Sequence, residues 1–467
     1  MAKRSRVSRA RKPATPAAPA TPAAAAAPGA PRIVDQPSFA QPAPTPDPTT
    51  FLVKHTSDAG AYKAIDVLNE QHGIAPLPFP APRGLPEPTL TLAEVFGSER
   101  SADVLAKIKA AGQIVFHAGG DCGSTTGPKF QDEVVDKMLG DFHESDQEEV
   151  PQFHILLGDI VYSFGETKYY YDQFYEPYRD YPAPIIALPG NHDGMVAPET
   201  SAASLAAYLR NFCSEKFAIL PEAGGLTRTS QIQPGVFYTF EAEYVRIITL
   251  YSNALEDPGY IADGPSVPKG TLGVSQLGFL TAALKRVKSE RYTGALIFAS
   301  HHPTYAGGGQ HGGSPEMQGQ IDAICAQVGV WPHAVLAGHA HNYQRFTRTR
   351  ADKTQIPYVI CGNSGHNVQK LRRSGPPMRT PQILQPAKAG SDEVVFENYD
   401  DQDYGYLRII ADPKQLRIEY HPASDGRAAK TPDDSVTVDL ASRQLAHYEA
   451  NDLGFPAAAR QARKSRP

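Results

Sequence analysis

From Gln113 onward, short apolar runs of strand length alternate with longer segments of helical periodicity, and this alternation constrains the fold more than any other feature of the sequence. A run of about four to eight apolar residues bounded by turn residues is typical of a buried strand. Alternating strands and helices form an α/β fold, because the helices pack against the faces of the sheets. The predicted strands cover residues 114–118, 153–157, 185–188, 245–251, 295–299, 334–337 and 358–361.

A hairpin and the two chain ends complete the predicted organisation. Residues 406–411 and 416–420 are further apolar runs, and the intervening Asp412 and Pro413 predict a β-hairpin. Residues 1–50 consist largely of Ala, Pro and Thr behind a basic cluster, a composition too poor in large apolar residues to form a core. We predict a disordered basic tail at 1–50, a lead-in segment at 51–112 with a helix near 102–111, a main domain at 113–425, and a C-terminal extension with a basic tail at 426–467.

The overall composition excludes several classes of protein. Apolar residues make up 41% of the chain, which is enough for a sizeable core, and the formal charge of −5 offers no global attraction for nucleic acid or an anionic membrane. Nucleic acid binding is therefore expected at most through the basic tail. No apolar stretch reaches the roughly 18 residues of a membrane span, and no apolar signal-peptide core follows the basic N-terminus. We therefore expect a cytoplasmic protein.

The cysteines give no sign of a structural metal or a disulfide framework. The four cysteines lie far apart in sequence and form no Cys-x-x-Cys pair. Zinc ribbons and disulfide-rich domains need closely spaced pairs. The cysteines are therefore predicted to be small core residues.

Polar clusters follow almost every predicted strand directly. The carboxyl ends of strands in α/β sheets are where ligands bind, because the loops there converge on one edge. We therefore expect the clusters to meet in space. They are Gly120-Asp121-Cys122-Gly123, Gly158-Asp159-Ile160-Val161-Tyr162, Gly190-Asn191-His192-Asp193, Ser300-His301-His302-Pro303 and Gly338-His339-Ala340-His341-Asn342.

Each cluster by itself is typical of an ordinary turn or loop cap. Gly followed by Asp is a frequent turn sequence, because Gly adopts positive φ and Asp bonds its own backbone. The combination is more informative, since carboxylates, an amide and several imidazoles occur at successive strand ends. Oxygen and imidazole ligands suit iron, zinc or manganese, whereas a structural zinc site usually contains thiolates.

The order of these clusters resembles the calcineurin-like metallophosphoesterases, and in detail their purple acid phosphatase branch. The blocks of that family read Asp-x-Gly, Gly-Asp-x-x-Tyr, Gly-Asn-His-Asp/Glu, x-x-His and Gly-His-x-His, and all occur in this order between Asp121 and His341. Residues 276–287 are similar to the helix that precedes the fourth block. The resemblance covers about residues 113–425 and implies a four-layer α/β/β/α sandwich of two mixed β-sheets flanked by helices.

The resemblance also implies which side chains bind metal. Asp159 would bridge two ions, one through each oxygen. The first ion would be completed by Asp121, Tyr162 and His341, and the second by Asn191, His301 and His339.

The first ion is implied to be Fe(III), with a divalent iron, zinc or manganese ion as its partner. Many members of the superfamily have a histidine where this chain has Gly123, and the phenolate of Tyr162 replaces that ligand. A hard, anionic phenolate favours Fe(III). Cys122 fits no ligand position of the family and is interpreted as packing.

Four further residues are implied to lie at the substrate or to orient a group that does. His192 would contact the phosphate and stabilise charge or protonate the leaving group, with its ring oriented by Asp193. His311 lies in a Gly-rich loop where some family members have a substrate-binding His-Gly pair, although an exposed histidine on a mobile loop is an equal alternative. His302 is expected to contact the phosphate or a ligand.

The expected activity is hydrolysis of small phosphate monoesters by water activated at two metals. A phosphodiesterase acting on nucleotides or phospholipid headgroups is an alternative on the same fold. A non-enzymatic phosphate-binding scaffold is the alternative from a different class.

Overall fold

A computed structural model describes residues 79–447, apart from gaps at 126, 144–146, 163, 196–202, 253–258, 264–275, 308–310, 372, 375–379, 382–391 and 427–431. The predicted N-terminal tail, residues 51–78 of the lead-in segment and the predicted basic C-terminal tail lie outside these described residues. No helix within the described ranges is long and apolar enough to cross a membrane.

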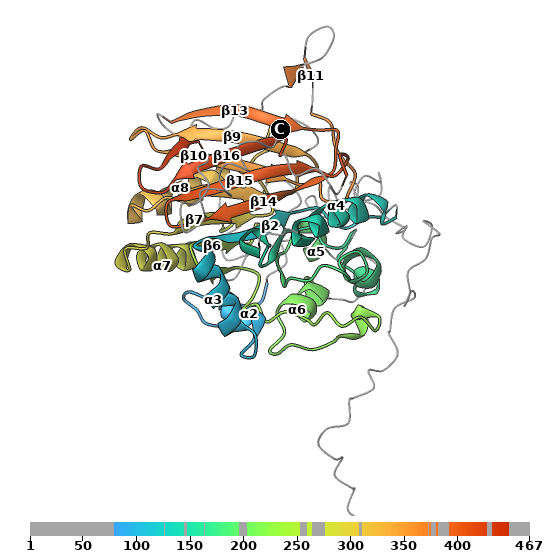
Figure 1. The fold of residues 1–467 in the computed structure, drawn as a ribbon. Helices are drawn as coiled ribbons and strands as arrows, with labels where there is room; N and C mark the ends of the chain where they lie inside the picture. Colours follow the sequence, from blue (N-terminus) through green and yellow to red (C-terminus); the bar gives the residue numbers. More distant parts are fainter. Residues whose placement is uncertain are drawn as a thin grey trace, which may run out of the picture.

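Two mixed β-sheets form the centre of the described chain (Figure 1). One sheet has the strand order β1-β5-β6-β7-β8-β10-β9-β13, and the other has the order β17-β16-β15-β14-β2-β3-β4. The strands of the first sheet are β1 (Thr89–Thr91), β5 (Tyr238–Ala242), β6 (Val245–Leu250), β7 (Ala295–Ser300), β8 (Ala334–Ala337), β10 (Gln355–Cys361), β9 (Tyr343–Thr349) and β13 (Glu393–Asp400). Those of the second are β17 (Gln444–Ala446), β16 (Asp434–Asp439), β15 (Gln415–Pro422), β14 (Gly405–Ala411), β2 (Ile114–Gly119), β3 (His154–Leu157) and β4 (Ile185–Leu188). A separate pair is formed by β11 (Arg373–Ser374) and β12 (Thr380–Pro381).

Parallel pairing brings the ends of the predicted strands together. Strands β2, β3 and β4 are parallel neighbours, and so are β6, β7, β8 and β10 in the other sheet. All seven strands predicted from the sequence are present, and the predicted hairpin forms β14 and β15. Strands β1, β16 and β17 join the same sheets from outside the range 113–425.

The two-residue periodicity of the strands creates two apolar layers. In β3, Ile155 and Leu157 belong to the cluster that also contains Ile297 of the other sheet, whereas Leu156 belongs to the cluster that includes the helices. Successive side chains of a strand point to opposite faces, so a strand that is apolar throughout is covered on both sides. One layer therefore lies between the sheets and includes Leu92, Val95 and Ile108 of the N-terminal helices, and the other attaches the helices at 129–140, 276–289 and 315–328.

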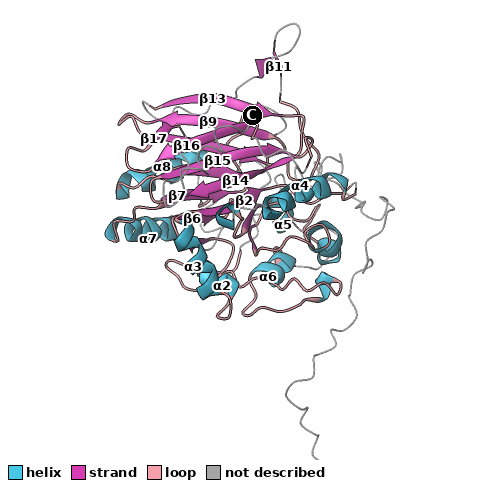
Figure 2. Ribbon diagram, viewed as in Figure 1, coloured by secondary structure: helices cyan, strands magenta, loops and turns pink. Residues whose placement is uncertain are grey.

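The helices complete the outer layers (Figure 2). Helix α4 contacts β14 of one sheet, and α7 contacts β6 of the other and packs beside α8. The helices are α2 (Leu92–Phe96), α3 (Ser101–Ala111), α4 (Lys129–Gly140), α5 (Asn191–Gly194), α6 (Ala206–Phe212), α7 (Gln276–Ser289) and α8 (Pro315–Val328), with a π-helical turn at Tyr171–Tyr175. The predicted four-layer sandwich is confirmed.

The cysteines are free thiols. Cys122, Cys325 and Cys361 are buried, and Cys213 is partly buried. Burial raises the pKa of the Cys122 thiol beyond its usual range, with a further contribution from the charge of Asp193. Their positions agree with the predicted packing role.

Candidate metal centre

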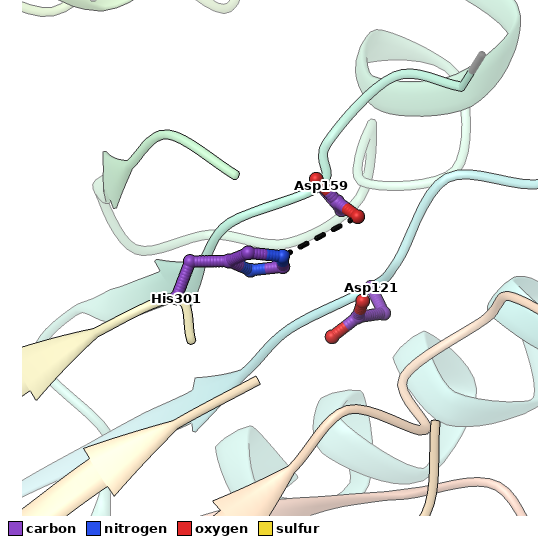
Figure 3. Close-up of side chains that lie close together, drawn as sticks. All are labelled: Asp121, Asp159 and His301. Atoms are coloured by element: carbon purple, nitrogen blue, oxygen red, sulfur yellow. Dashed lines mark ion pairs between the residues drawn. The ribbon is translucent and has the colours of Figure 1, made fainter. Parts of the chain in front are cut away.

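The polar clusters converge at the carboxyl ends of the strands. Figure 3 shows Asp121, Asp159 and His301 directed toward one another from three strand ends. One ligand atom from each lies within 4.8 Å of the others, and all three side chains are buried. The side chains predicted to provide oxygen ligands follow β2, β3 and β4 of one sheet, and those predicted to provide nitrogen ligands follow β7 and β8 of the other.

The first donor group consists of three atoms at nearly equal separation. The hydroxyl oxygen of Tyr162 lies 3.1 Å from Asp121 Oδ1 and 3.4 Å from His341 Nε2. His341 Nε2 lies 3.3 Å from Asp121 Oδ1. This triangle contains the residues that the sequence assigns to the first ion.

The second donor group is arranged around His301. Its Nε2 lies 2.9 Å from Asn191 Oδ1, 3.2 Å from His339 Nδ1 and 3.4 Å from Asp159 Oδ2. These are the residues predicted for the second ion, including the carboxylate predicted to bridge.

The spacing of the donor atoms fits metal ligation. Ligands held about 2.0–2.2 Å from an ion lie roughly 2.8–3.6 Å from their neighbours in octahedral or tetrahedral geometry. Asp159 Oδ2 is buried and has no hydrogen-bond partner among the described residues, which is costly for a carboxylate oxygen unless a cation is nearby. The donor set of carboxylate, phenol, amide and imidazole suits iron, zinc or manganese.

Strained backbone positions hold the ligands in place. Asp121, Asp159 and His339 have positive φ angles of 56°, 54° and 67°. Residues other than glycine adopt this region at a cost, and such strain is concentrated at functional sites. Gly190 permits a close approach, because a Cβ atom there would lie 2.0 Å from Asp159 Oδ1.

Electrostatics favour the ionised form of the Asp159 carboxylate. Burial tends to raise the pKa of Asp159, but the charges of His301 and His192 outweigh it and lower the pKa below its usual range. Burial by itself tends to lower the pKa of His301. The charge of Asp159 acts in the opposite direction and outweighs burial, so that the pKa of His301 is raised to about 9. The pKa of Tyr162 lies well above its ordinary value because of burial and the charge of Asp121.

His192 and Asp193 lie beside the donors. The His192 ring is buried, packs 4.4 Å from the Tyr162 ring and has its Nε2 3.9 Å from Asp159 Oδ2. The Asp193 carboxylate accepts hydrogen bonds from the N–H groups of Gly190 (2.8 Å) and Ile160 (3.1 Å). These bonds tie two strand-end turns together, and the orientation of the His192 ring by Asp193 stays a prediction.

The structure brings His311 and His302 to the site. The His311 ring lies 4.1 Å from that of His339, and the residue is only 9% exposed, unlike the alternative of an exposed loop histidine. Its neighbours Gly308 and Gly309 lie outside the described residues. His302 is buried with its Nδ1 3.1 Å from the Ser252 hydroxyl oxygen, and its ring lies 4.1 Å from that of His339.

His366 belongs to the site but was not predicted from the sequence. Its ring stacks on Tyr162 with centroids 3.7 Å apart and planes 6° from parallel. Its Nδ1 lies 3.2 Å from the Gly123 carbonyl oxygen, and its own N–H donates to the Asp121 carbonyl at 2.8 Å. The available signal was the polar cluster at 362–366, which follows a predicted strand as the other clusters do.

The comparison with protein families gives a match. Residues 116–343 match the model of the calcineurin-like phosphoesterases. The search of curated proteins gives no match.

Solved structures resemble the chain at low sequence identity. A purple acid phosphatase from yellow lupin seeds is 17% identical, with 70% of this chain and 54% of that chain covered and a TM-score of 0.47. This chain thus spans about half the length of the lupin protein. GAP50 of Plasmodium is 13% identical, with 76% and 95% covered and a TM-score of 0.42. PhoD is 12% identical, with 73% and 72% covered and a TM-score of 0.46. The family match covers residues 116–343, slightly under half of the chain, and this region is similar to the calcineurin-like phosphoesterases.

Proposed function

We propose that the protein hydrolyses phosphate monoesters by using a pair of metal ions held in the two donor groups. The observation that carries this proposal is the presence of two sets of ligand atoms. The three atoms of the first set lie 3.1–3.4 Å from one another, and three atoms of the second set lie 2.9–3.4 Å from His301 Nε2. We assign Asp159 to both sets as the bridging carboxylate, as the family resemblance implies. Its Oδ2 faces His301, while its Oδ1 accepts a hydrogen bond from the His192 N–H at 2.9 Å.

The positive charge of a pair of ions in these positions would lower the pKa of a bound water and stabilise both the attacking and the leaving oxygen. The residues of the chain position this charge and surround it. Phosphate oxygens are negatively charged, and the imidazoles of His192, His302 and His311 lie around the donors to receive them. His192 is proposed to give a proton to the leaving alkoxide, because it is not needed as a ligand.

The first ion is proposed to be Fe(III), with divalent iron, zinc or manganese as its partner. The support is the position of the Tyr162 hydroxyl in the first donor group. Metal binding there has to remove the phenol proton, since the pKa of Tyr162 is raised in the metal-free protein.

The test combines a substrate pair with ligand variants. We expect hydrolysis of p-nitrophenyl phosphate to exceed that of its bis-ester, and we expect Asp159→Asn and His339→Ala each to lower activity by at least about 100-fold with loss of bound metal. Elemental analysis measures the metal. Asp103→Asn, on the exposed side of α3, is the control and should change neither quantity.

The outcomes separate the alternatives. Faster hydrolysis of the bis-ester would favour the phosphodiesterase. A protein that holds both metals but cleaves neither ester would favour the phosphate-binding scaffold. Full activity in either ligand variant would refute the assignment of the site.

A further inference from the structure

A cavity lies at the opposite ends of the strands that carry His301 and His339. It has a volume of about 320 Å³ and is lined by residues from the C-terminal ends of α7 and α8 and from the starts of β7 and β8. Leu296 of β7 lines this cavity, and His301 follows the other end of the same strand. With about 3.3 Å per residue along a strand, the two regions are roughly 17 Å apart. We call this cavity the basic pocket.

The basic pocket carries an excess of positive charge. Among the described residues that line it, Lys288, Arg291, Arg350 and Arg443 are cationic, and Asp352 is the acidic one. Four positive charges and one negative charge leave an excess of three, in a chain whose formal charge is −5. Such a local excess of one sign attracts ions of the other sign.

The guanidinium of Arg443 is held in a fixed position without an acidic partner. Its Nη2 donates to the carbonyls of Trp331 (2.6 Å) and Pro332 (2.7 Å), and its Nη1 lies 3.1 Å from His333 Nε2. Burial and the charge of Arg350 lower the pKa of Arg443. No ion pair to a carboxylate is found for Arg443 within the described part of the chain. The pocket therefore places Arg350 and Arg443 close together, and of these two only Arg350 has an ion pair with a carboxylate among the described residues.

Two further hydrogen-bond donors of the pocket lack partners. Arg350 Nε and the Tyr292 hydroxyl are buried and have no hydrogen-bond partner among the described residues. Arg350 Nη1 pairs with Asp352 at 2.7 Å, and its guanidinium lies 3.8 Å above the Trp331 ring. A buried donor without an acceptor is costly, and native proteins usually supply the acceptor. No described residue supplies an acceptor to either donor here.

Capping of the helices explains only part of this arrangement. Lys288 Nζ donates to the Val328 carbonyl at 2.7 Å, near the end of α8, where a cation is favourable. This role does not account for Arg291, for the unpartnered Nε of Arg350 or for the proximity of Arg350 to Arg443.

We propose that the basic pocket binds a phosphate group, either free or as part of a small phosphorylated molecule, at a site separate from the metal centre. A phosphate dianion offers several acceptor oxygens and offsets most of the excess charge. Arginine forks suit phosphate geometry, and the Tyr292 hydroxyl adds a neutral donor. The cavity volume leaves room for an organic group beside Trp331.

Fluorescence provides a selective test, because Trp331 is the single tryptophan of the chain and lines the pocket. Titration with inorganic phosphate and with phenylphosphonate, whose C–P bond a phosphoesterase does not cleave, should change the Trp331 emission in a saturable way. Tighter binding of phenylphosphonate would indicate a phosphorylated small molecule, and equal binding would indicate free phosphate. The response should persist in His339→Ala, in which the metal centre is impaired.

Variants of exposed residues test the charge without disturbing the core. Lys288→Gln and Arg291→Gln should each weaken binding about two- to fivefold, and the double variant about five- to twentyfold. Lys285→Gln is the matched control, since Lys285 is exposed on the same helix but does not line the pocket. Equal affinity in the double variant and the wild type would overturn the proposal. So would the absence of both a fluorescence response and a calorimetric signal in His339→Ala.

Discussion

Replacing Tyr162 with phenylalanine separates the phenol ligand from the packing of its ring. The ring is completely buried between the rings of His366 and His192, so phenylalanine should occupy the same space. Without metal, the lost contact is the 3.1 Å hydrogen bond to Asp121 Oδ1. Asp121 keeps His341 Nε2 at 3.3 Å from Oδ1 and the His339 N–H at 2.7 Å from Oδ2. The expected loss in the free energy of unfolding is therefore only about 1 kcal/mol.

The affinity for metal should change much more than the free energy of unfolding. Tyr162 is one of the four side chains proposed to hold the first ion, and even the loss of an outer-shell partner typically costs about 10–100-fold in affinity. We expect at least this loss in Fe(III) affinity for Tyr162→Phe. Fewer protons should be released on binding, because the wild-type phenol has to ionise.

Competitive chelation measures the affinity, and visible absorption reports iron–phenolate bonding. Iron-loaded wild-type protein should be purple or pink, and Tyr162→Phe should lose this colour. Tyr175→Phe is the control, because Tyr175 is also buried and its hydroxyl donates to Asn211 at 2.6 Å, remote from the donors. Unchanged iron affinity in Tyr162→Phe, or a colourless iron-loaded wild type, would mean that Tyr162 is a packing residue.

Three further changes test neighbouring features. His192→Ala should keep the metal content and lower turnover by roughly 10²–10⁴-fold, whereas parallel loss of metal would make His192 a ligand. His366→Ala should shift the iron–phenolate absorption by freeing the Tyr162 ring, and His366→Phe should largely restore it; identical spectra would exclude a positioning role. Asp172→Asn should raise the midpoint of thermal unfolding by about 1–3 °C at pH 8 and leave it unchanged near pH 4. Burial and the charge of Glu176 raise the pKa of Asp172 to about 7. Asp172 is therefore tolerated as a neutral carboxyl below the unfolded pKa of 3.8. The free energy of unfolding decreases as the pH rises from 3.8 through 7, because the folded protein then has to bury an ionised carboxylate. A higher midpoint at both pH values would contradict this cause.

The positions of the strands could be predicted because an apolar run and its flanking turn residues are features of the local sequence. The apolar run that became β8 has the same limits in the sequence and the structure, at 334–337, and Gly and polar residues mark its end. The convergence of Asp121, Asp159 and His301 followed from the rule that ligands gather at carboxyl strand ends. The match of the clusters to family motifs added the order of the ligands.

Other features depend on contacts that sequence spacing does not encode. His366 stacks on Tyr162 across 204 positions of sequence, and no motif marks this distance. From the sequence alone, the carboxylate of Asp193 could contact the His192 ring or the backbone. In the folded chain it accepts hydrogen bonds from the N–H groups of Gly190 and Ile160. The position of His311 was undecided for the same reason, since only the folded loop shows its ring beside His339.

The division of the ligands between the sheets affects how the site can evolve. The proposed oxygen ligands belong to one sheet and the imidazoles to the other, and each donor group draws on both. A slight slide of one sheet over the other would alter the spacing of both groups at once. Substitutions between the sheets, for example at Ile155 or Ile297, would thus affect both proposed metal positions although neither side chain is a proposed ligand. The metal preference of the proposed centre would then depend partly on the hydrophobic interior, and its two positions would not vary independently.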